Sequence, residues 1–295
     1  MLLRTIGIVF HAFSIDRTSC VCHLFQWKQI PGDELPVAGG CADETERTDS
    51  SRYGWGRGIG RAYCERLAAD GANVVVLDLD DTKPVVDGLG GSGDKTGMIC
   101  DVSKPEQITE VANAVLKRFG RCDIFVNNAA VFPVTDLSTV TLEVWRHVQA
   151  VNVEPLVLFA QAFVPGMAEA HWGRIVSTGS SVTLSQQQHD LAYVTSKGSI
   201  HVLVRALAND LGEKGITVNA IAPSVVKTEG LVARTPASGP PVDELINLVV
   251  SQQTIKRPST PTDAANALSF LVSDDAAFIT GQILHVDGGF SRSGA

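Results

Sequence analysis

The sequence has few cysteines and no long hydrophobic or basic segment, and these absences narrow what the chain can be. Its 6 cysteines include no Cys-x-x-Cys pair, and Cys20-Val-Cys22-His23 lacks the second ligand pair that a zinc site needs. We therefore expect no metal centre. No apolar run approaches the roughly 20 residues of a membrane helix, and the 24 Lys and Arg are scattered without a basic stripe. Neither a membrane protein nor a nucleic-acid-binding protein is expected.

The composition is that of an acidic, folded domain. The 295 residues are 44% hydrophobic and carry a net charge of -8, which suits one α/β domain with a substantial core. The apolar N-terminus is interrupted by His11, and no clean small-residue cleavage site follows it, so secretion is not expected. A cytoplasmic location, where thiols stay reduced, is the expectation.

From Gly54 onward, helix-like and strand-like segments alternate, which is the pattern of a parallel sheet with helices on both faces. The predicted strands are 73–78, 97–100, 122–128, 173–179, 216–222 and 282–286, and the predicted helices are 59–70, 105–119, 141–168, 190–213 and 261–273. Residues 224–258 contain four prolines and predict a lid over a pocket. The fold class expected for residues 54–295 is a single, doubly wound α/β domain.

Residues 1–53 do not fit this pattern. A doubly wound nucleotide-binding fold needs a buried strand directly before its glycine-rich turn, but residues 43–52 are charged and include no apolar residue. One hypothesis is a reading-frame error, because the codons of residues 52–55, read one base later, can spell Val-Thr-Gly-Gly. A genuine N-terminal extension and a degenerate paralogue are the alternatives. We interpret 1–53 as an irregular N-terminal segment, either out of frame or disordered.

Tyr193 and Lys197 are four residues apart in a predicted helix and therefore share one face of it. A lysine held beside a tyrosine favours the phenolate, and this lowers the pKa of the phenol from its ordinary value of about 10. The tyrosine can then serve as a general base. Upstream, Ser180 ends an apolar run that predicts a buried strand, and Asn152 lies within the long helical pattern.

A glycine-rich turn precedes the first predicted helix. Its residues are Gly54, Gly58, Ile59 and Gly60. The N-terminal amides and dipole of such a helix can receive a pyrophosphate. Asp78 ends the next strand, where a carboxylate accepts hydrogen bonds from both ribose hydroxyls and repels a 2′-phosphate. The cofactor predicted is therefore NAD rather than NADP, although Arg57 in the turn is a counter-signal for NADP.

Together these motifs resemble the short-chain dehydrogenase/reductase family over roughly residues 54–290. The resemblance implies a Rossmann fold and hydride transfer between NAD and a small-molecule secondary alcohol or ketone. The catalytic residues that it implies are Asn152, Ser180, Tyr193 and Lys197, with Ser181 in place of Ser180 if the loop slips by one. Tyr193 would exchange the substrate proton, Ser180 would hold the substrate oxygen, and Asn152 would bend its helix and hold a water that links Lys197 to solvent.

The resemblance also implies a cofactor site and an assembly. The cofactor-binding residues would be Gly54, Gly58, Ile59, Gly60, Asp78, Asp101, Val102, Asn128, Ala129, Tyr193, Lys197, Pro223, Val226 and Thr228. Asp101 would bond the adenine amino group, the backbone of Val226 would hold the nicotinamide carboxamide, and Thr228 would bond the carboxamide or the phosphate. The C-terminal segment 279–289 would pack across the interface of a homodimer or homotetramer.

The lid and the loop after Ser180 supply apolar side chains and few charges, which favours an uncharged, partly apolar substrate. These side chains are Val182, Leu184, Leu231, Val232, Leu245 and Leu248. Arg234, Lys256 and Arg257 could instead meet a carboxylate or a carrier-bound thioester, so a 3-oxoacyl thioester reductase using NADPH is the nearest alternative. An inactive binding or structural subunit is the alternative from another class, because the chain lacks an obvious first strand.

Overall fold

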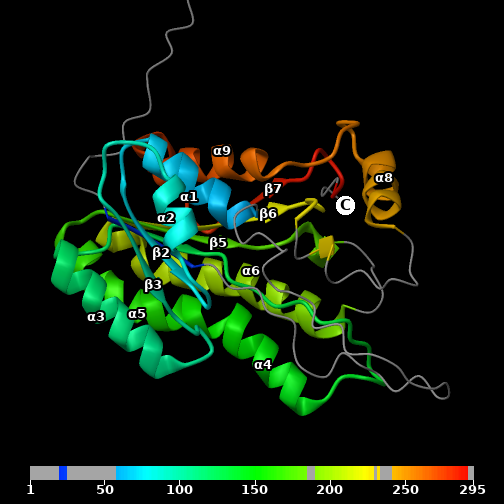
Figure 1. The fold of residues 1–295 in the computed structure, drawn as a ribbon, viewed down its shortest axis with the longest axis horizontal. Coiled ribbons are helices and arrows are strands. Elements are labelled where there is room, and N and C mark those ends of the chain that lie inside the picture. Colours follow the sequence, from blue (N-terminus) through cyan, green and yellow to red (C-terminus); the bar gives the residue numbers. More distant parts are fainter. Residues whose placement is uncertain (1–19, 25–57, 185–189, 229–230, 233–240, 292–295) are drawn as a thin grey trace, which may run out of the picture.

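The fold is a parallel sheet between two layers of helices (Figure 1). The computed structural model describes residues 20–24, 58–184, 190–228, 231–232 and 241–291. In this part of the chain the strands form one seven-stranded sheet in the order β3-β2-β1-β4-β5-β6-β7, and every neighbouring pair is parallel. The strands are β1 (Cys20–Leu24), β2 (Asn73–Asp78), β3 (Lys95–Ile99), β4 (Ile124–Asn127), β5 (Gly173–Thr178), β6 (Ile216–Pro223) and β7 (Ile283–Val286).

Helices cover both faces of the sheet and create two apolar clusters. They are α1 (Ile59–Ala69), α2 (Lys83–Gly88), α3 (Pro105–Phe119), α4 (Leu142–Asn152), α5 (Glu154–Glu169), α6 (Leu191–Leu211), α8 (Val242–Gln252) and α9 (Pro261–Val272). The face under α3 to α6 contains Phe125, Phe159 and Phe163, whose rings contact one another. The opposite face, under α1 and α9, is built around Leu67 and Leu268. The sheet is therefore buried on both sides, as a parallel sheet requires.

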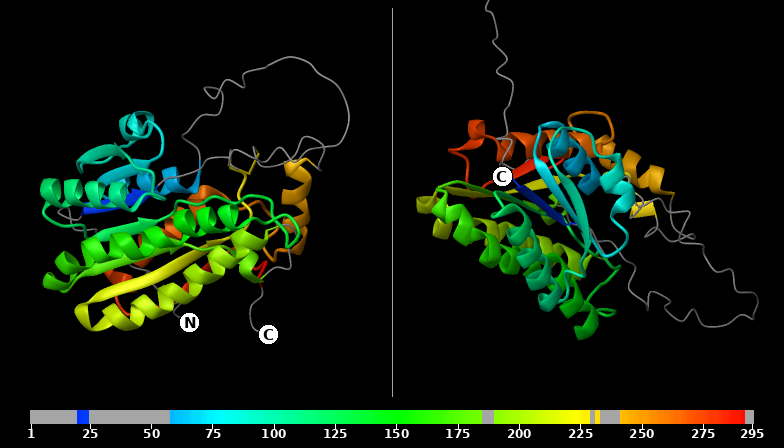
Figure 2. Two further views of the ribbon diagram at one scale, coloured as in Figure 1. Left: turned by 90° about the horizontal axis from the view of Figure 1, so that it is seen from below. Right: turned by 60° about the vertical axis from the view of Figure 1, so that its left-hand side comes forward.

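The sheet contains a central strand that the sequence pattern did not predict. β1 lies between β2 and β4 and pairs with both, so that Val21 is opposite Val74 on one side and Ile124 on the other. Figure 2 shows this strand in dark blue inside the sheet. The expectation that residues 1–53 supply no first strand is therefore wrong. The strand was missed because it does not directly precede the glycine-rich turn; residues 25–57, between β1 and α1, lie outside the described residues.

The predicted helix 141–168 is two helices. α4 ends at Asn152, and α5 begins at Glu154 after Val153, whose φ of -116° and ψ of -54° depart from helical geometry. Pro155 lies in the first turn of α5 and has no N–H with which to continue the hydrogen bonds of α4. The helix is thus interrupted at Val153, next to Asn152, where the resemblance implied a bend.

The segment formed by α4 and α5, Leu142–Glu169, is the one stretch of described helix with the length and composition to cross a membrane, which is weak evidence by itself. Its side chains Leu156, Phe159 and Phe163 are fully buried against the sheet. A buried apolar face of this kind is what the core helix of an α/β domain needs. We therefore interpret the segment as a core layer of the domain.

A chain that begins at Gly54 should fail to fold cooperatively. It would lack β1, so β2 and β4 would each present an unpaired edge in the middle of the sheet, and buried unpaired backbone groups cost free energy. We expect no cooperative urea transition when this variant is followed by circular dichroism, whereas the full-length chain shows one. A truncated chain that unfolded cooperatively with the full-length free energy would show that β1 is dispensable.

Candidate active site

The predicted site residues gather at the carboxyl ends of the strands. Asp78 ends β2, Asn127 ends β4 and Pro223 ends β6, while Ser180 follows β5. The strand order reverses between β1 and β4, and ligands of doubly wound sheets bind outside the strand ends at such a switch point. Topology alone therefore brings segments far apart in the sequence to one edge of the sheet.

Tyr193 and Lys197 lie together in the first turns of α6. The Nζ atom of Lys197 is 5.7 Å from the centroid of the Tyr193 ring. Lys197 is 3% exposed, and its ammonium group donates a hydrogen bond of 2.7 Å to the carbonyl oxygen of Thr178. Burial lowers the pKa of Lys197 to about 8, so the cation still predominates at neutral pH. A buried positive charge is therefore held against the phenol.

The tyrosine ring also contacts an aromatic side chain. The rings of Phe132 and Tyr193 have centroids 5.7 Å apart and are inclined at 59°. Tilted ring pairs at this separation are attractive and restrict how a side chain can turn. Phe132 follows the Asn-Asn-Ala-Ala segment at the end of β4. The phenol is thus positioned by two elements, α6 and the loop after β4.

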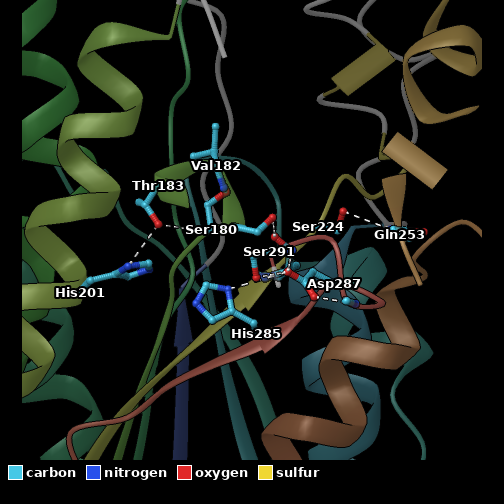
Figure 3. A network of polar contacts seen from close by, with 12 residues as sticks. Ser180, Val182, Thr183, His201, Ser224, Gln253, His285, Asp287 and Ser291 are labelled. Atoms are coloured by element: carbon cyan, nitrogen blue, oxygen red, sulfur yellow. Dashed lines mark hydrogen bonds and ion pairs between the residues drawn. The ribbon is translucent and has the colours of Figure 1, made fainter. Parts of the chain in front are cut away.

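Ser180 and Ser181 follow β5 but have different surroundings. The hydroxyl of Ser181 is buried and donates a hydrogen bond of 3.0 Å to the carbonyl oxygen of Pro223. Ser180 is half-buried, and its Oγ accepts a hydrogen bond of 3.2 Å from the amide of Val182. Among the described residues no acceptor is assigned to its own hydroxyl proton, and Figure 3 shows the residue between Thr183 and Ser291. The structure therefore favours Ser180 over Ser181 as the serine that meets a substrate.

Asn152 connects the loop after β4 with α6. Its Nδ2 donates hydrogen bonds of 2.9 Å to both the Val131 carbonyl and Ser196 Oγ, and its Oδ1 accepts one of 2.8 Å from the Val131 amide. Ser196 Oγ in turn donates to the Tyr193 carbonyl over 2.7 Å. These contacts orient the turn of α6 that bears the tyrosine and lysine. The water relay implied for Asn152 stays a prediction.

The two asparagines after β4 link it to β5. Asn127 Nδ2 donates to Ser177 Oγ over 3.2 Å, and Thr178 Oγ1 donates to Asn128 Oδ1 over 2.9 Å. Thr178 therefore has two functions, because its carbonyl oxygen also accepts the hydrogen bond of the Lys197 ammonium. The ends of β4, β5 and α6 are joined at this one residue.

The residues at the start of α1 and the end of β2 fit a dinucleotide. Gly58 is the N-cap of α1 with no side-chain cap among the described residues, and a Cβ there would have no atom within 4 Å. The first amides of the helix are thus available to an anion. Burial raises the pKa of Asp78 to about 7, against a hydrogen bond from the Asp80 amide. Further donors, such as a pair of ribose hydroxyls, would stabilise this buried carboxylate.

The remaining predicted cofactor residues lie around the same edge. Ile59 and Gly60 begin α1, Val102 and Ala129 are buried, and Gly54 lies outside the described residues. The Asp101 carboxylate accepts hydrogen bonds from the amide and hydroxyl of Ser103. An adenine amino group would have to share this carboxylate with Ser103. None of the described residues forms a cluster of three His, Cys, Asp or Glu that could hold a metal ion.

The described part of the predicted lid, residues 224–258, contacts the rest of the domain after β6. Val226 is buried and forms an isolated bridge with Ser259, and Thr228 Oγ1 accepts a hydrogen bond of 3.3 Å from the Leu231 amide. Arg57 and Arg234, proposed on sequence grounds as basic contacts, lie outside the described residues. The two ends of the lid therefore meet beside the predicted nicotinamide contacts.

Three residues of the site were missed in the sequence. Thr178 acts through a backbone carbonyl, so its side chain carries no sign of the role. Ser196 lies inside the Tyr-x-x-x-Lys spacing, and only its buried position next to Asn152 reveals its link. Phe132 reaches Tyr193 across the fold. Each of these roles depends on tertiary contacts that no local pattern encodes.

Replacing Lys197 by Met should stabilise the protein at neutral pH. The folded state lowers the pKa of Lys197 to about 8 from 10.5, so it costs free energy to keep the ammonium buried below pH 8. We expect Lys197→Met to raise the free energy of unfolding at pH 7 by on the order of 1–3 kcal/mol. The unfolded state binds the extra proton between pH 8 and 10.5, so the stability of the natural chain rises there.

The gain of the variant should therefore shrink between pH 7 and pH 10, which urea unfolding at the two pH values would measure. Lys197→Arg, which keeps the charge, is the matched control and should show no gain. A Met variant less stable than the natural chain at pH 7 would mean that the hydrogen bond to Thr178 outweighs the cost of burial.

Known proteins resemble this chain over most of its length. The family model described as Enoyl-(Acyl carrier protein) reductase matches residues 54–291. The 3-oxoacyl-[acyl-carrier-protein] reductase FabG of Vibrio cholerae is 32% identical over 238 residues, which are 80% of this chain and 94% of that protein. The D-beta-hydroxybutyrate dehydrogenase of Rhizobium meliloti is 33% identical over 244 residues, 79% of this chain and 95% of that protein.

A solved structure resembles the whole fold. It is that of a candidate NAD(P)-dependent gluconate 5-dehydrogenase from Beutenbergia cavernae with NADP bound at low occupancy, and it has a TM-score of 0.76 and 28% identity. The match covers 94% of this chain and 100% of that one. The expected fold class is confirmed, and with it the family that the motifs resembled. The chain belongs to the short-chain dehydrogenase/reductase family of NAD(P)-dependent oxidoreductases that act on CH–OH groups.

Proposed function

We propose that the protein transfers a hydride between NAD and a secondary alcohol or its ketone, with Tyr193 as the group that exchanges the substrate proton. The observation that carries this proposal is the buried Lys197 ammonium held against the Tyr193 ring. Coulomb attraction is strong where water is excluded, so this charge favours the phenolate. A phenolate at that position can act as a general base.

In the direction of oxidation, the Tyr193 phenolate takes the hydroxyl proton while Ser180 donates a hydrogen bond to the substrate oxygen. The nicotinamide supplies a hydride acceptor when it is bound. Lys197 keeps its proton throughout and stabilises the phenolate before the transfer. Asn152 and Ser196 hold the α6 turn in register, and such fixed geometry lowers the entropic part of the barrier. Reduction of the ketone runs through the same groups in reverse.

The choice of NAD over NADP rests on Asp78. Its carboxyl group ends β2, accepts hydrogen bonds from the backbone amides of Leu79 and Asp80, and has a pKa raised by burial. Ribose hydroxyls would stabilise the carboxylate, whereas a 2′-phosphate would place like charges together. The Beutenbergia structure contains NADP, so the NAD preference has no support from the comparisons and depends on Asp78 alone.

The substrate that we propose is uncharged and partly apolar. Leu184, Val232 and Leu248 are 53%, 43% and 58% exposed around the loop after Ser180 and the lid, as expected of side chains that would cover an apolar ligand. The FabG relatives suggest a 3-oxoacyl thioester as the second candidate. Two of the three cations proposed for it already have partners: Arg257 pairs with Asp263, and the Lys256 ammonium donates to the Ser251 carbonyl. The third, Arg234, lies outside the described residues.

We also propose that the protein forms a homodimer or homotetramer in the cytoplasm. Phe278 is fully exposed and Leu284 is 37% exposed, and both belong to the C-terminal segment 279–289 or its immediate neighbourhood. Exposed apolar side chains of this size are what a second copy of the chain could cover. Sedimentation of the purified protein at micromolar concentration would give its mass directly.

Tyr193→Phe should abolish turnover but keep the cofactor site. The substitution removes only the hydroxyl that exchanges the proton, and loss of a general acid or base typically costs 10²–10⁴-fold in rate. We expect kcat for a secondary-alcohol panel to fall by at least about 10³-fold, with the Kd for NADH, measured by fluorescence, within about 3-fold of the natural chain. Full turnover by the variant would contradict the assignment, and an absent NADH signal in the natural chain would favour the inactive subunit.

The preference for NADH over NADPH should weaken as the pH falls from 8 to 6. The pKa of Asp78 is raised to about 7 by burial, so the carboxyl group is mainly ionised at pH 8 and mainly protonated at pH 6. The ionised form accepts ribose hydroxyls and repels a phosphate. We expect the ratio of the two Kd values to change by about 10-fold between these pH values.

Asp78→Asn is the matched control for this titration. It has no ionisable group at position 78, so any remaining pH dependence belongs to the 2′-phosphate, whose own pKa is about 6. The natural chain and the variant should therefore differ in the slope of the Kd ratio against pH. Identical slopes would show that Asp78 does not set the choice of nucleotide.

A further inference from the structure

His201 lies one helical turn beyond Lys197 on α6 and faces the loop that bears Ser180. Figure 3 shows its ring directed toward Thr183. A Cβ atom added at Gly179 would lie 2.4 Å from His201 Nε2 and 3.0 Å from its Cδ2. The imidazole therefore occupies the space that any larger residue at position 179 would need. The ring and the loop are in close contact immediately before Ser180.

A chain of hydrogen bonds connects this ring to the backbone of Ser180. Thr183 Oγ1 donates to the Ser180 carbonyl oxygen over 3.1 Å, and Thr183 Oγ1 is 3.4 Å from His201 Nδ1. A hydroxyl has one proton. Because Thr183 gives that proton to Ser180, the second contact requires His201 Nδ1–H as the donor. The imidazole then has its lone pair on Nε2, which has no hydrogen-bond partner among the described residues.

The electrostatic surroundings of His201 keep it neutral. Burial, together with the nearby His285, Lys197 and Arg205, lowers its pKa to about 4. The rings of His201 and His285 form an edge-on pair with centroids 6.4 Å apart. At neutral pH the ring therefore carries one N–H, and the contact with Thr183 places it on Nδ1, which suits a fixed support and not a proton carrier.

We propose that His201 is a positioning residue for Ser180: through Thr183 it fixes the backbone carbonyl of Ser180 and so the direction of the Ser180 hydroxyl. The inference rests on the proposed function, in which that hydroxyl meets the substrate oxygen. Displacement of a catalytic group by about 1 Å can cost on the order of 10²-fold in rate. By fixing the Ser180 backbone, His201 would therefore influence kcat without contacting substrate or nucleotide.

The two amide substitutions at position 201 separate a positioning role from simple packing. His201→Asn places an amide nitrogen where Nδ1 lies, facing Thr183, whereas His201→Gln places it where Nε2 lies, facing Gly179. We expect His201→Asn to keep kcat within about 3-fold, and His201→Gln and His201→Leu to lower it about 10-fold. The Kd for NADH should stay within 2-fold in all three, because none of them touches the cofactor residues.

Thr183→Val tests the same chain from its other end. It removes the hydroxyl that bridges the ring and the Ser180 carbonyl, so it should also lower kcat about 10-fold. The double variant His201→Leu/Thr183→Val should be no slower than the slower single variant, since both act through one connection. Val202→Ala, at a position 65% exposed on the same helix, is the control and should change nothing.

Equal losses in the Asn and Gln variants, or fully multiplicative losses in the double variant, would overturn the proposal. If the natural chain itself does not turn over any alcohol or ketone, the proposed function fails. The effect of His201 on the backbone of the loop after Ser180 can still be measured. Hydrogen exchange at the Val182 and Thr183 amides should then be about 10-fold faster in His201→Leu and unchanged in His201→Asn. Unchanged exchange in both variants would likewise overturn it.

Discussion

The burial of one ammonium group, that of Lys197, is the constraint on which the rest of the site depends. Its hydrogen bond goes to the Thr178 carbonyl at the end of β5, so the helix that carries Tyr193 must lie against that strand end. Removing a charge from water is costly, and the lowered pKa of the lysine records this cost. Burial of this charge therefore destabilises the folded state, and the packing of the core must offset that cost. The result is a positive charge beside the phenol in surroundings of low dielectric constant.

The sheet determines where this charge lies relative to the other groups. The ends of β2, β4, β5 and β6 bring Asp78, Asn127, Thr178 and Pro223 to one edge, and the order of the strands places the switch point between β1 and β4. Hydrogen bonds then tie these ends together, since Thr178 contacts Asn128 through its side chain and Lys197 through its backbone. Asn152 joins the loop after β4 to α6 in the same way. Catalytic geometry is thus a property of the whole carboxyl edge of the sheet.

The sequence predicted most of the strands and helices within a few residues, because a parallel sheet buried on both faces leaves short apolar runs between amphipathic helices. It also placed Tyr193 and Lys197 on one helix face, a local consequence of helical periodicity. It failed at β1, whose position in the chain breaks the usual spacing to the glycine-rich turn, and it joined α4 and α5 although Pro155 separates them. The roles of Thr178, Ser196, Phe132 and His201 could not be predicted, since each arises from contacts between segments distant in sequence.

The effect of Lys197 on the Tyr193 phenol can be measured directly by a spectroscopic titration of the tyrosines. The chain has only 3 of them: Tyr53, Tyr63 and Tyr193. Burial raises the pKa of Tyr63 far above its ordinary value, so in a Tyr53→Phe background Tyr193 is the group expected to ionise first. We expect one phenol to ionise more than about one pH unit below the ordinary value of about 10. This low-pH ionisation should disappear in Lys197→Met. If Tyr193 ionises at or above about pH 10 while Lys197 is present, Lys197 does not stabilise the phenolate.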